Sequence, residues 1–127
     1  MSKKILIADD DEVIKSILEA MLGSLGYSVS MVSTGAECLE HLRSNTVDIL
    51  FLDYLLDDMS GGEVISEIEK SSEIKQDLRV ILTTANSREE LEQMDPSTKI
   101  DYYLAKPFDL AALKQVLSEV ESTHQSP

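Results

Sequence analysis

Short runs of consecutive apolar residues that stop at charged residues limit the folds available to this chain. The three clearest runs, each with the residues that follow it, are Ile5–Ala8 with Asp9 and Asp10, Ile49–Leu52 with Asp53, and Tyr102–Ala105 with Lys106 and Pro107. Such runs suit strands that are covered on both faces, as in a parallel sheet. Because parallel strands end at one edge, three carboxylates and one ammonium would gather there.

Carboxylates gathered at one edge repel one another, by about 4 kcal/mol per pair at an effective dielectric constant near 20. A bound divalent cation removes this repulsion, and a ligand set made of oxygen atoms suits Mg²⁺, with Mn²⁺ as an alternative. Lys106, at the end of the third run, would then be placed to hold a phosphoryl group. The residues therefore predict a site that accepts phosphate.

Length and composition narrow the class of protein further. A chain of 127 residues can bury a core as one domain, and its formal net charge of −13 disfavours binding to nucleic acids and anionic membranes. No apolar run is long enough to span a bilayer, and the first residues pass into a strand pattern rather than a signal peptide. Cys38 is the only cysteine, so no intrachain disulfide can form. We expect a cytoplasmic protein.

Five apolar runs alternate with five stretches of helical periodicity. The expected strands are residues 5–8, 29–32, 49–52, 80–82 and 102–105. The apolar residues expected on the inner helix faces are, in five groups, Val13, Ile14, Ile17, Leu18, Met21, Leu22 and Leu25; Ala36, Leu39 and Leu42; Val64, Ile65 and Ile68; Leu91 and Met94; and Leu110, Leu113, Val116, Leu117 and Val120. This alternation predicts an α/β fold with a doubly wound, five-stranded parallel sheet.

Capping signals mark where several helices begin. Capping boxes start at Thr34 and at Ser87, and Asp109 is expected to cap the last helix. Pro96 would end the fourth helix early, so we expect that helix to be short. We expect one domain over residues 1–121, with residues 122–127 as a tail or the start of a linker.

The order of these signals resembles the receiver domain of bacterial two-component response regulators, including the single-domain chemotaxis type. The resemblance covers roughly residues 3–120 and rests on four motifs: Ile-Ala-Asp-Asp-Asp at 7–11, Leu-Asp-Tyr-Leu-Leu at 52–56, Thr-Thr-Ala at 83–85 and Lys-Pro-Phe at 106–108. It implies a flavodoxin-like sheet with strand order 2-1-3-4-5. It also implies a phosphorylation switch that catalyses only its own modification and turns over no free substrate.

The resemblance implies the roles of the acidic residues. Asp53 would accept a phosphoryl group from a histidine kinase or a phosphotransfer protein. Asp10, Asp53 and the backbone carbonyl of Leu55 would bind Mg²⁺ directly, and Asp9 would bind it through a water molecule. Asp11 is different, because we interpret it as a cap of the first helix.

The resemblance also implies how the switch would work. Lys106 and Thr84 would each contact a phosphoryl oxygen, and Tyr103 would be a rotating aromatic residue that follows Thr84 inward. The Lys106–Pro107 peptide bond would be cis. The fourth helix, fifth strand and fifth helix would form the face that binds a downstream protein or output domain. The protein would be a monomer or a phosphorylation-dependent dimer.

The sequence departs from the family pattern at several positions. Asp57 stands where many receivers have proline, and we interpret Asp57 and Asp58 as solvated loop acids rather than metal ligands. Lys99 and Ile100 stand where glycine and alanine are common, which leaves the shape of the fourth helix open. Asn86 could orient a hydrolytic water, and the lifetime of the phosphoryl group also stays open.

Three other functions are alternatives to a stand-alone switch. The chain could be the N-terminal receiver of a longer regulator, which its sequence does not distinguish. An aspartyl-phosphate phosphatase would usually carry a second acid where Leu55 stands. A nucleotide or flavin carrier would need a turn rich in Gly, Ser or Thr where Asp9-Asp10-Asp11 stands. The last two are disfavoured by these residues.

Overall fold

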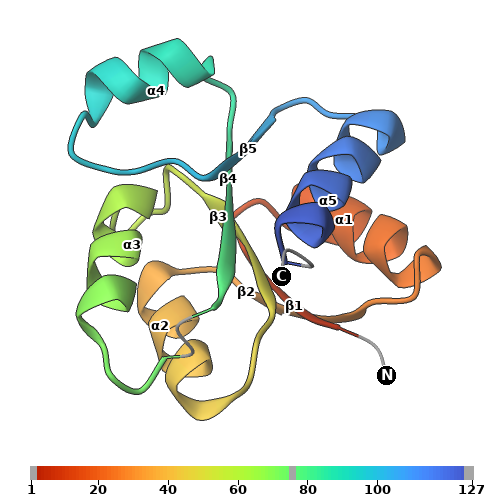
Figure 1. The fold of residues 1–127 in the computed structure, drawn as a ribbon, viewed down its shortest axis with the longest axis horizontal. Helices are drawn as coiled ribbons and strands as arrows, with labels where there is room; N and C mark the ends of the chain where they lie inside the picture. The colour runs from red at the N-terminus through yellow and green to blue at the C-terminus, as the bar shows by residue number, and fades with distance from the viewer. Residues whose placement is uncertain (1–2, 75–76, 125–127) are drawn as a thin grey trace.

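A computed structural model describes residues 3–74 and 77–124 of the chain. In these residues, strands and helices alternate (Figure 1). The strands are β1 (Lys4–Ala8), β2 (Ser28–Val32), β3 (Ile49–Asp53), β4 (Arg79–Thr84) and β5 (Tyr102–Ala105). The helices are α1 (Glu12–Ser24), α2 (Gly35–Ser44), α3 (Gly61–Lys70), α4 (Arg88–Met94) and α5 (Leu110–His124).

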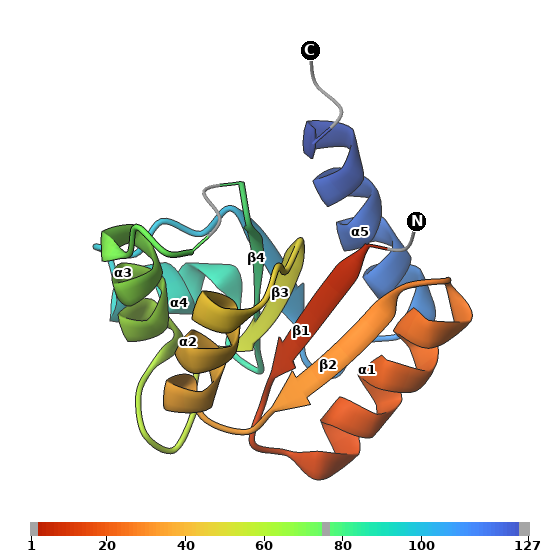
Figure 2. The ribbon, with the colours of Figure 1, turned by 90° about the horizontal axis from the view of Figure 1, so that it is seen from below.

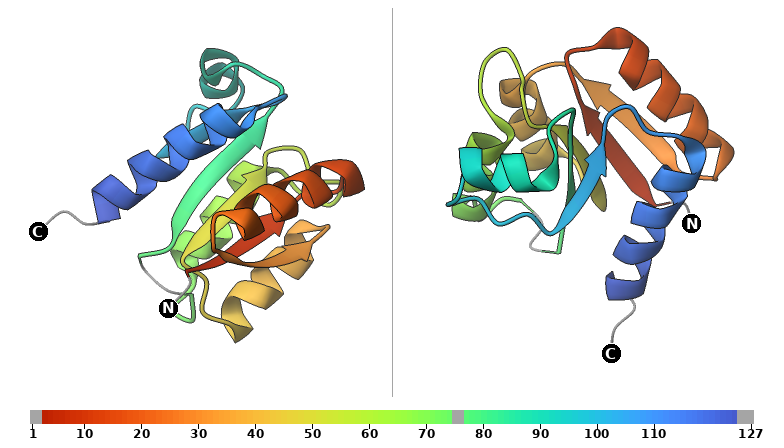
Figure 3. Two further views of the ribbon diagram at one scale, coloured as in Figure 1. Left: turned by 90° about the vertical axis from the view of Figure 1, so that its right-hand side faces the viewer. Right: turned by 90° about the horizontal axis from the view of Figure 1, so that it is seen from above.

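The strands form one parallel sheet in the order β2-β1-β3-β4-β5. This confirms the predicted flavodoxin-like α/β fold. β3 lies at the centre, and all five of its residues are buried. The sheet is covered on both sides: α1 and α5 lie on one face, and α2, α3 and α4 lie on the other (Figures 2 and 3).

Successive residues of each inner strand pack against opposite helix layers, because side chains alternate along a strand. Ile49 and Phe51 belong to the core shared with α1 and α5, whereas Leu50 and Leu52 belong to the core shared with α2, α3 and α4. Four consecutive apolar residues are therefore needed to fill both cores. This is the physical reason that the apolar runs identify the strands.

Side-chain caps fix the start of most helices. Thr34 and Ser87 form the predicted capping boxes, and Asp11 and Asp109 accept hydrogen bonds from first-turn amides as predicted. Ser60 forms a third capping box, and α3 begins at Gly61.

The predicted inner faces of the helices were wrong at their margins. Five residues predicted on these faces are exposed. Their exposed fractions are 66% for Val13, 41% for Ile17, 38% for Leu25, 51% for Met94 and 40% for Leu110. On α1, Val13 and Ile17 lie roughly 100° or more around the helix from the buried Leu18, at 3.6 residues per turn. Leu25 lies beyond the last helical residue.

The inner face of α2 is rotated from the predicted one. Ala36 is exposed, and Cys38 is buried in its place beside Leu39 and Leu42. Apolar periodicity counts Ala as a core residue, but the larger Cys38 and the leucines decide the helix orientation because they bury more surface.

The lengths of α4 and α5 can be compared with the predicted ones. α4 is short, as predicted, with Leu91 as its buried residue. α5 continues to His124, so this helix extends into residues 122–124 of the predicted tail or linker.

Within residues 3–74 and 77–124, none of the helices combines the length and the apolar character that crossing a membrane requires.

Leu18 and Val13 provide a test of the orientation of α1. We expect Leu18→Ala to lower the free energy of unfolding by about 2–5 kcal/mol, because its side chain is buried. Val13→Ala should change it by less than about 0.5 kcal/mol, because this side chain is exposed. Urea denaturation of both variants measures the difference, and equal losses would contradict the helix orientation.

Candidate functional site

Three carboxylates meet at the carboxyl ends of β1 and β3. The parallel register pairs Ala8 with Leu52, so the chain leaves the two strands side by side at Asp9 and Asp53. Asp9, Asp10 and Asp53 each offer a carboxylate oxygen, and these oxygens lie within 4.8 Å of one another. Asp9 and Asp53 are buried, with exposed fractions of 1% and 7%. The predicted acidic cluster is therefore present, and it can hold a metal ion.

Lys106 reaches this cluster from the end of β5. Its Nζ lies 2.7 Å from Asp9 Oδ2 and 3.5 Å from Asp53 Oδ2. Burial alone would lower the pKa of Lys106, but the hydrogen bond to Asp9 and the charge of Asp53 raise it above the ordinary value. The ammonium is therefore charged at neutral pH. The Lys106–Pro107 peptide bond is cis, as expected.

The cluster changes the acidity of Asp53. Burial and the negative charge of Asp9 raise the pKa of Asp53 to about 6, although Lys106 and the Leu55 amide act to lower it. The Leu55 amide lies 3.3 Å from Asp53 Oδ1. One ammonium therefore does not fully compensate the neighbouring carboxylates, and the site favours additional positive charge.

Asp9 belongs to the cluster, whereas the neighbouring Asp11 caps α1. The Asp11 amide donates to Asp9 Oδ1 at 2.9 Å, while Lys106 occupies Asp9 Oδ2. The Asp11 carboxylate itself accepts from the amides of Val13 and Ile14. The interpretation of Asp11 as a helix cap is confirmed.

Thr84 and Tyr103 both bind Asn86. Thr84 is buried at the end of β4, and its hydroxyl donates to Asn86 Oδ1 at 3.1 Å and accepts from the Asn86 amide at 3.2 Å. The half-buried Tyr103 donates its hydroxyl to the Asn86 carbonyl. The two expected switch residues therefore meet at one residue just before α4. The side chain of Asn86 is engaged with Thr84 rather than free to orient a water.

Asp58 has a role that sequence reasoning missed. Its carboxylate accepts from the amides of Gly35 and Ala36 at 2.8 and 2.9 Å, and these hydrogen bonds hold its pKa below the ordinary value. Asp58 is exposed and lies outside the acidic cluster, as expected, but its hydrogen bonds to α2 were not predicted. The bonds tie the loop after Asp53 to the start of α2, in a loop without the usual proline at residue 57.

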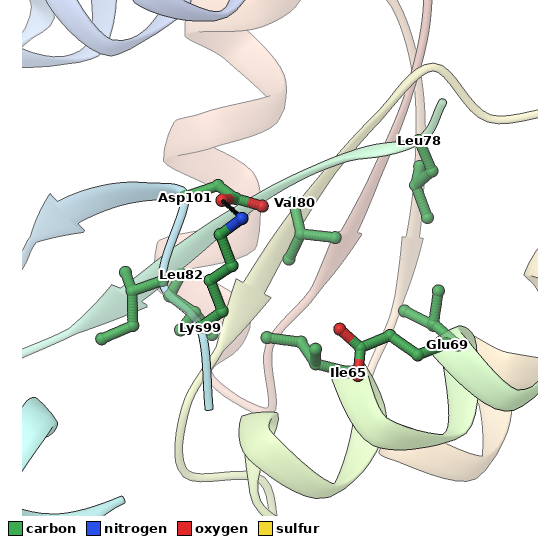
Figure 4. A pocket seen from close by; sticks show the side chains of 9 residues that line it. Ile65, Glu69, Leu78, Val80, Leu82, Lys99 and Asp101 are labelled. Carbon is green, nitrogen blue, oxygen red and sulfur yellow. Dashed lines mark ion pairs between the residues drawn. The ribbon is translucent and has the colours of Figure 1, made fainter. Parts of the chain in front are cut away.

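A pocket of about 180 Å³ between α3, β4 and the segment before β5 is separate from this cluster (Figure 4). Ile65 and Glu69 on α3 and Val80 on β4 line it, and Lys99 and Asp101 form an ion pair of 3.9 Å at its rim. None of its lining residues belongs to the acidic cluster. The chemistry of the chain therefore centres on the strand ends.

The acidic cluster, the lysine and the strand order agree with the comparison to known protein families. The family model of the response regulator receiver domain matches residues 5–118. This chain belongs to that family. It therefore takes part in two-component signalling, in which receiver domains act as signalling switches rather than as enzymes and interact with histidine kinases.

Relatives of this receiver domain occur in different proteins. It is 30% identical over 122 residues to the response regulator MprA of Mycobacterium bovis, covering 96% of this chain and 50% of MprA. It thus spans half the length of that relative. It is 27% identical to the receiver domain of the sensor histidine kinase PA1611 from Pseudomonas aeruginosa, with a TM-score of 0.83, covering 96% and 99% of the two chains. That structure has a magnesium ion coordinated in its active site cleft.

A third comparison concerns the fold alone. The chemotaxis response regulator CheY4 of Vibrio cholerae has a TM-score of 0.85 and 24% sequence identity, covering 94% of this chain and 99% of CheY4. The receiver domain thus shares its whole architecture with a single-domain regulator.

The Asp58 contact generates a pH-dependent prediction. We expect Asp58→Ala to lower the free energy of unfolding by about 1 kcal/mol at neutral pH, as loss of a helix cap does. Because the folded protein lowers the pKa of Asp58, this stabilisation is present above pH ~4 and is lost as the pH falls through the lowered pKa.

Denaturation of the wild-type protein and Asp58→Ala between pH 7 and acidic pH tests this prediction. Asp57→Ala is the matched control, since Asp57 is an exposed acid in the same loop. A stability difference that stays constant down to strongly acidic pH would contradict the role of the charged Asp58 carboxylate.

Proposed function

We propose that this receiver domain is a phosphorylation-controlled switch in which Asp53 accepts a phosphoryl group from a phosphohistidine. The donor would be a histidine kinase or a phosphotransfer protein. The observation that carries the proposal is that Asp53 lies in one cluster with the carboxylates of Asp9 and Asp10, with the ammonium of Lys106 3.5 Å away. A nucleophilic carboxylate, oxygen ligands for a cation and a fixed positive charge are the groups that phosphoryl transfer requires.

The donor set of this site fits Mg²⁺, and Mn²⁺ would also be accepted. Three carboxylates against one ammonium leave an excess of negative charge, and oxygen ligands suit these hard cations. Asp10, Asp53 and the Leu55 carbonyl would be direct ligands. Asp9 would act through a water molecule, because its two oxygens already bind Lys106 and the Asp11 amide. The magnesium site of the PA1611 receiver supports this choice of metal.

In the transfer step, a carboxylate oxygen of Asp53 attacks phosphorus while the bond from phosphorus to the donor imidazole nitrogen breaks. The electron pair of that bond goes to the imidazole, which takes up a proton from solvent, and an aspartyl phosphate is formed. When Mg²⁺ is bound, it would neutralise part of the negative charge on the transferred group. Lys106 would hold a phosphoryl oxygen. Dephosphorylation is the attack of water on phosphorus with release of the Asp53 carboxylate.

The switch would begin at Thr84. A phosphoryl group adds a charge of about −1.5 to −2 and new acceptor oxygens at Asp53. The Thr84 hydroxyl would then exchange its bond to Asn86 for a bond to a phosphoryl oxygen. Since Tyr103 also binds Asn86, the residues before α4 and on β5 would move together. This exchange would change the face formed by α4, β5 and α5, where a downstream protein or an output domain would bind.

The receiver domain can act alone, or it can be part of a longer protein of either kind seen among its relatives. MprA is a response regulator of twice this length, and PA1611 is a sensor histidine kinase. We propose residues 1–121 as the receiver domain and residues 122–127 as a tail or the start of a linker, into which α5 continues as far as His124. Phosphorylation of a monomer, with or without subsequent dimerisation, is compatible with this arrangement.

Asp53→Asn tests the phosphoacceptor. With Mg²⁺ and a small phosphodonor such as acetyl phosphate, the wild-type protein should gain the mass of one phosphoryl group, and Asp53→Asn should gain none. The amide is a much weaker nucleophile than the carboxylate. Intact-mass spectrometry measures the gain, and Asp57→Asn should label normally. Equal labelling of Asp53→Asn would contradict the assignment.

Asp10→Asn tests the metal ligands. We expect it to weaken Mg²⁺ binding about tenfold or more, because it removes a negatively charged ligand. Asp11→Asn should bind Mg²⁺ like the wild-type protein, since Asp11 caps α1 and Asn is an equally good cap. Mg²⁺ titrations followed by tyrosine fluorescence give the affinities. Equal affinities of the two variants would exclude Asp10 as a ligand.

A further inference from the structure

Tyr54, the residue directly after Asp53, connects the phosphorylation site to the far end of α4. Its side chain is buried, with an exposed fraction of 6%, and its hydroxyl donates to Asp95 Oδ2 at 2.8 Å. Asp95 is the C-cap residue of α4. A single side chain therefore spans from the end of β3 to the segment that leads from α4 into β5.

The carboxylate of Asp95 organises that segment. Besides Tyr54, it accepts from the hydroxyl of Thr98 at 2.8 Å and from that of Ser97 at 3.2 Å. Burial alone would raise the pKa of Asp95, but these hydrogen bonds lower it. The carboxylate is thus charged at neutral pH and shared between Tyr54 and the turn after α4.

Two glycines at the start of α3 make this arrangement possible. A Cβ atom at Gly61 would lie 3.0 Å from the Tyr54 Cα atom, and one at Gly62 would lie 2.1 Å from Asp95 Oδ2 and 2.7 Å from Thr98 Oγ1. The Gly61 amide also donates to the Tyr54 carbonyl. The Gly-Gly pair, which phosphoryl transfer leaves unexplained, therefore gives Tyr54 and Asp95 their space.

α4 is held by one buried side chain and by hydrogen bonds at its two ends. It has seven residues and stands apart from the other helices (Figure 1), and Leu91 is its buried residue. Before its first residue, Asn86 binds Thr84 and Tyr103. After its last residue, Asp95 binds Tyr54. Both ends of α4 are thus tied to side chains close to Asp53.

We propose that Tyr54 is a positioning residue that, through Asp95, couples the state of Asp53 to the turn between α4 and β5. This inference rests on the proposed function. The Leu55 amide contacts the Asp53 carboxylate, so a change at that carboxylate displaces the backbone on both sides of Tyr54. The hydroxyl of Tyr54 passes the displacement to Asp95 and Thr98. Coupling between two sites is reciprocal, so a partner that fixes this turn also changes the stability of the phosphorylated state.

Tyr54→Phe removes the hydroxyl and keeps the ring. The experiment adds Mg²⁺ and beryllium fluoride, a stable mimic of a phosphoryl group, and records the amide chemical shifts of Ser97, Thr98 and Lys99. We expect large shift changes in the wild-type protein and changes at least about threefold smaller in Tyr54→Phe, because the hydroxyl that connects Tyr54 to Asp95 is absent. Shift changes at Ser87, beside Asn86, should persist. Tyr27→Phe, which loses a hydroxyl bonded to Glu121, should behave like the wild-type protein.

Variants of Asp95 test the coupling from its other end. Asp95→Asn keeps an oxygen that accepts from Tyr54 and should retain most of the shift changes, whereas Asp95→Ala should lose them. These variants leave the residue beside Asp53 intact, so they remain informative if Tyr54→Phe folds poorly.

The outcomes separate this inference from the proposed function. Undiminished shift changes at residues 97–99 in Tyr54→Phe or Asp95→Ala would overturn the coupling alone. A wild-type protein that shows no response, and that takes up no phosphoryl group at Asp53, would overturn the proposed function and the coupling with it.

Discussion

Repulsion among Asp9, Asp10 and Asp53 is the interaction on which the rest of the site depends. Their carboxylate oxygens lie within 4.8 Å of one another, and Lys106 is the one cation that ion-pairs with the cluster in the described part of the chain. Each pair of charges at such distances is unfavourable by about 4 kcal/mol at an effective dielectric constant near 20. The buried residues Ile5–Ala8 of β1 and the buried strand β3 hold the carboxylates together despite this. Burial, and then the charge of Asp9, raise the pKa of Asp53. A divalent cation would relieve the repulsion among the carboxylates and would, with Lys106, balance the negative charge that a phosphoryl group brings.

The sheet edge that carries these residues could be predicted from the sequence because its determinants are local. A strand covered on both faces needs consecutive apolar residues, and the charged residue after it must lie outside the core, as Asp53 does after Leu52. Parallel strands bring such residues together without any contact having to be predicted. The positions of Asp9, Asp53 and Lys106 therefore followed from the pattern, and the motif resemblance added their roles.

The contacts that hold the loops could not be predicted in this way, because they join residues far apart in the chain. Asp58 binds amides 22 and 23 residues away, and Tyr54 binds Asp95 41 residues away. The sequence around Asp58 and around Tyr54 gives no local signal of such partners. The predicted inner face of α1 was wrong at Val13 for a related reason. Val13 and Leu18 are both apolar, and only the packing of α1 against the sheet decides which of them is buried. In the sequence, the Gly61-Gly62 pair is a sign of the close approach to Tyr54 and Asp95.

The way α4 is attached suits a switch. A helix held by a large apolar face would need several kcal/mol to move, whereas each hydrogen bond contributes a net of about 0.5–1.5 kcal/mol. α4 buries Leu91 and is tied at one end by Asn86 and at the other by Asp95. Exchange of a few such bonds is comparable in free energy to the difference between two populated conformations of a switching protein. A phosphoryl group at Asp53, which competes for Thr84 and displaces Tyr54, would therefore act on both ends of α4 with enough energy to change its position.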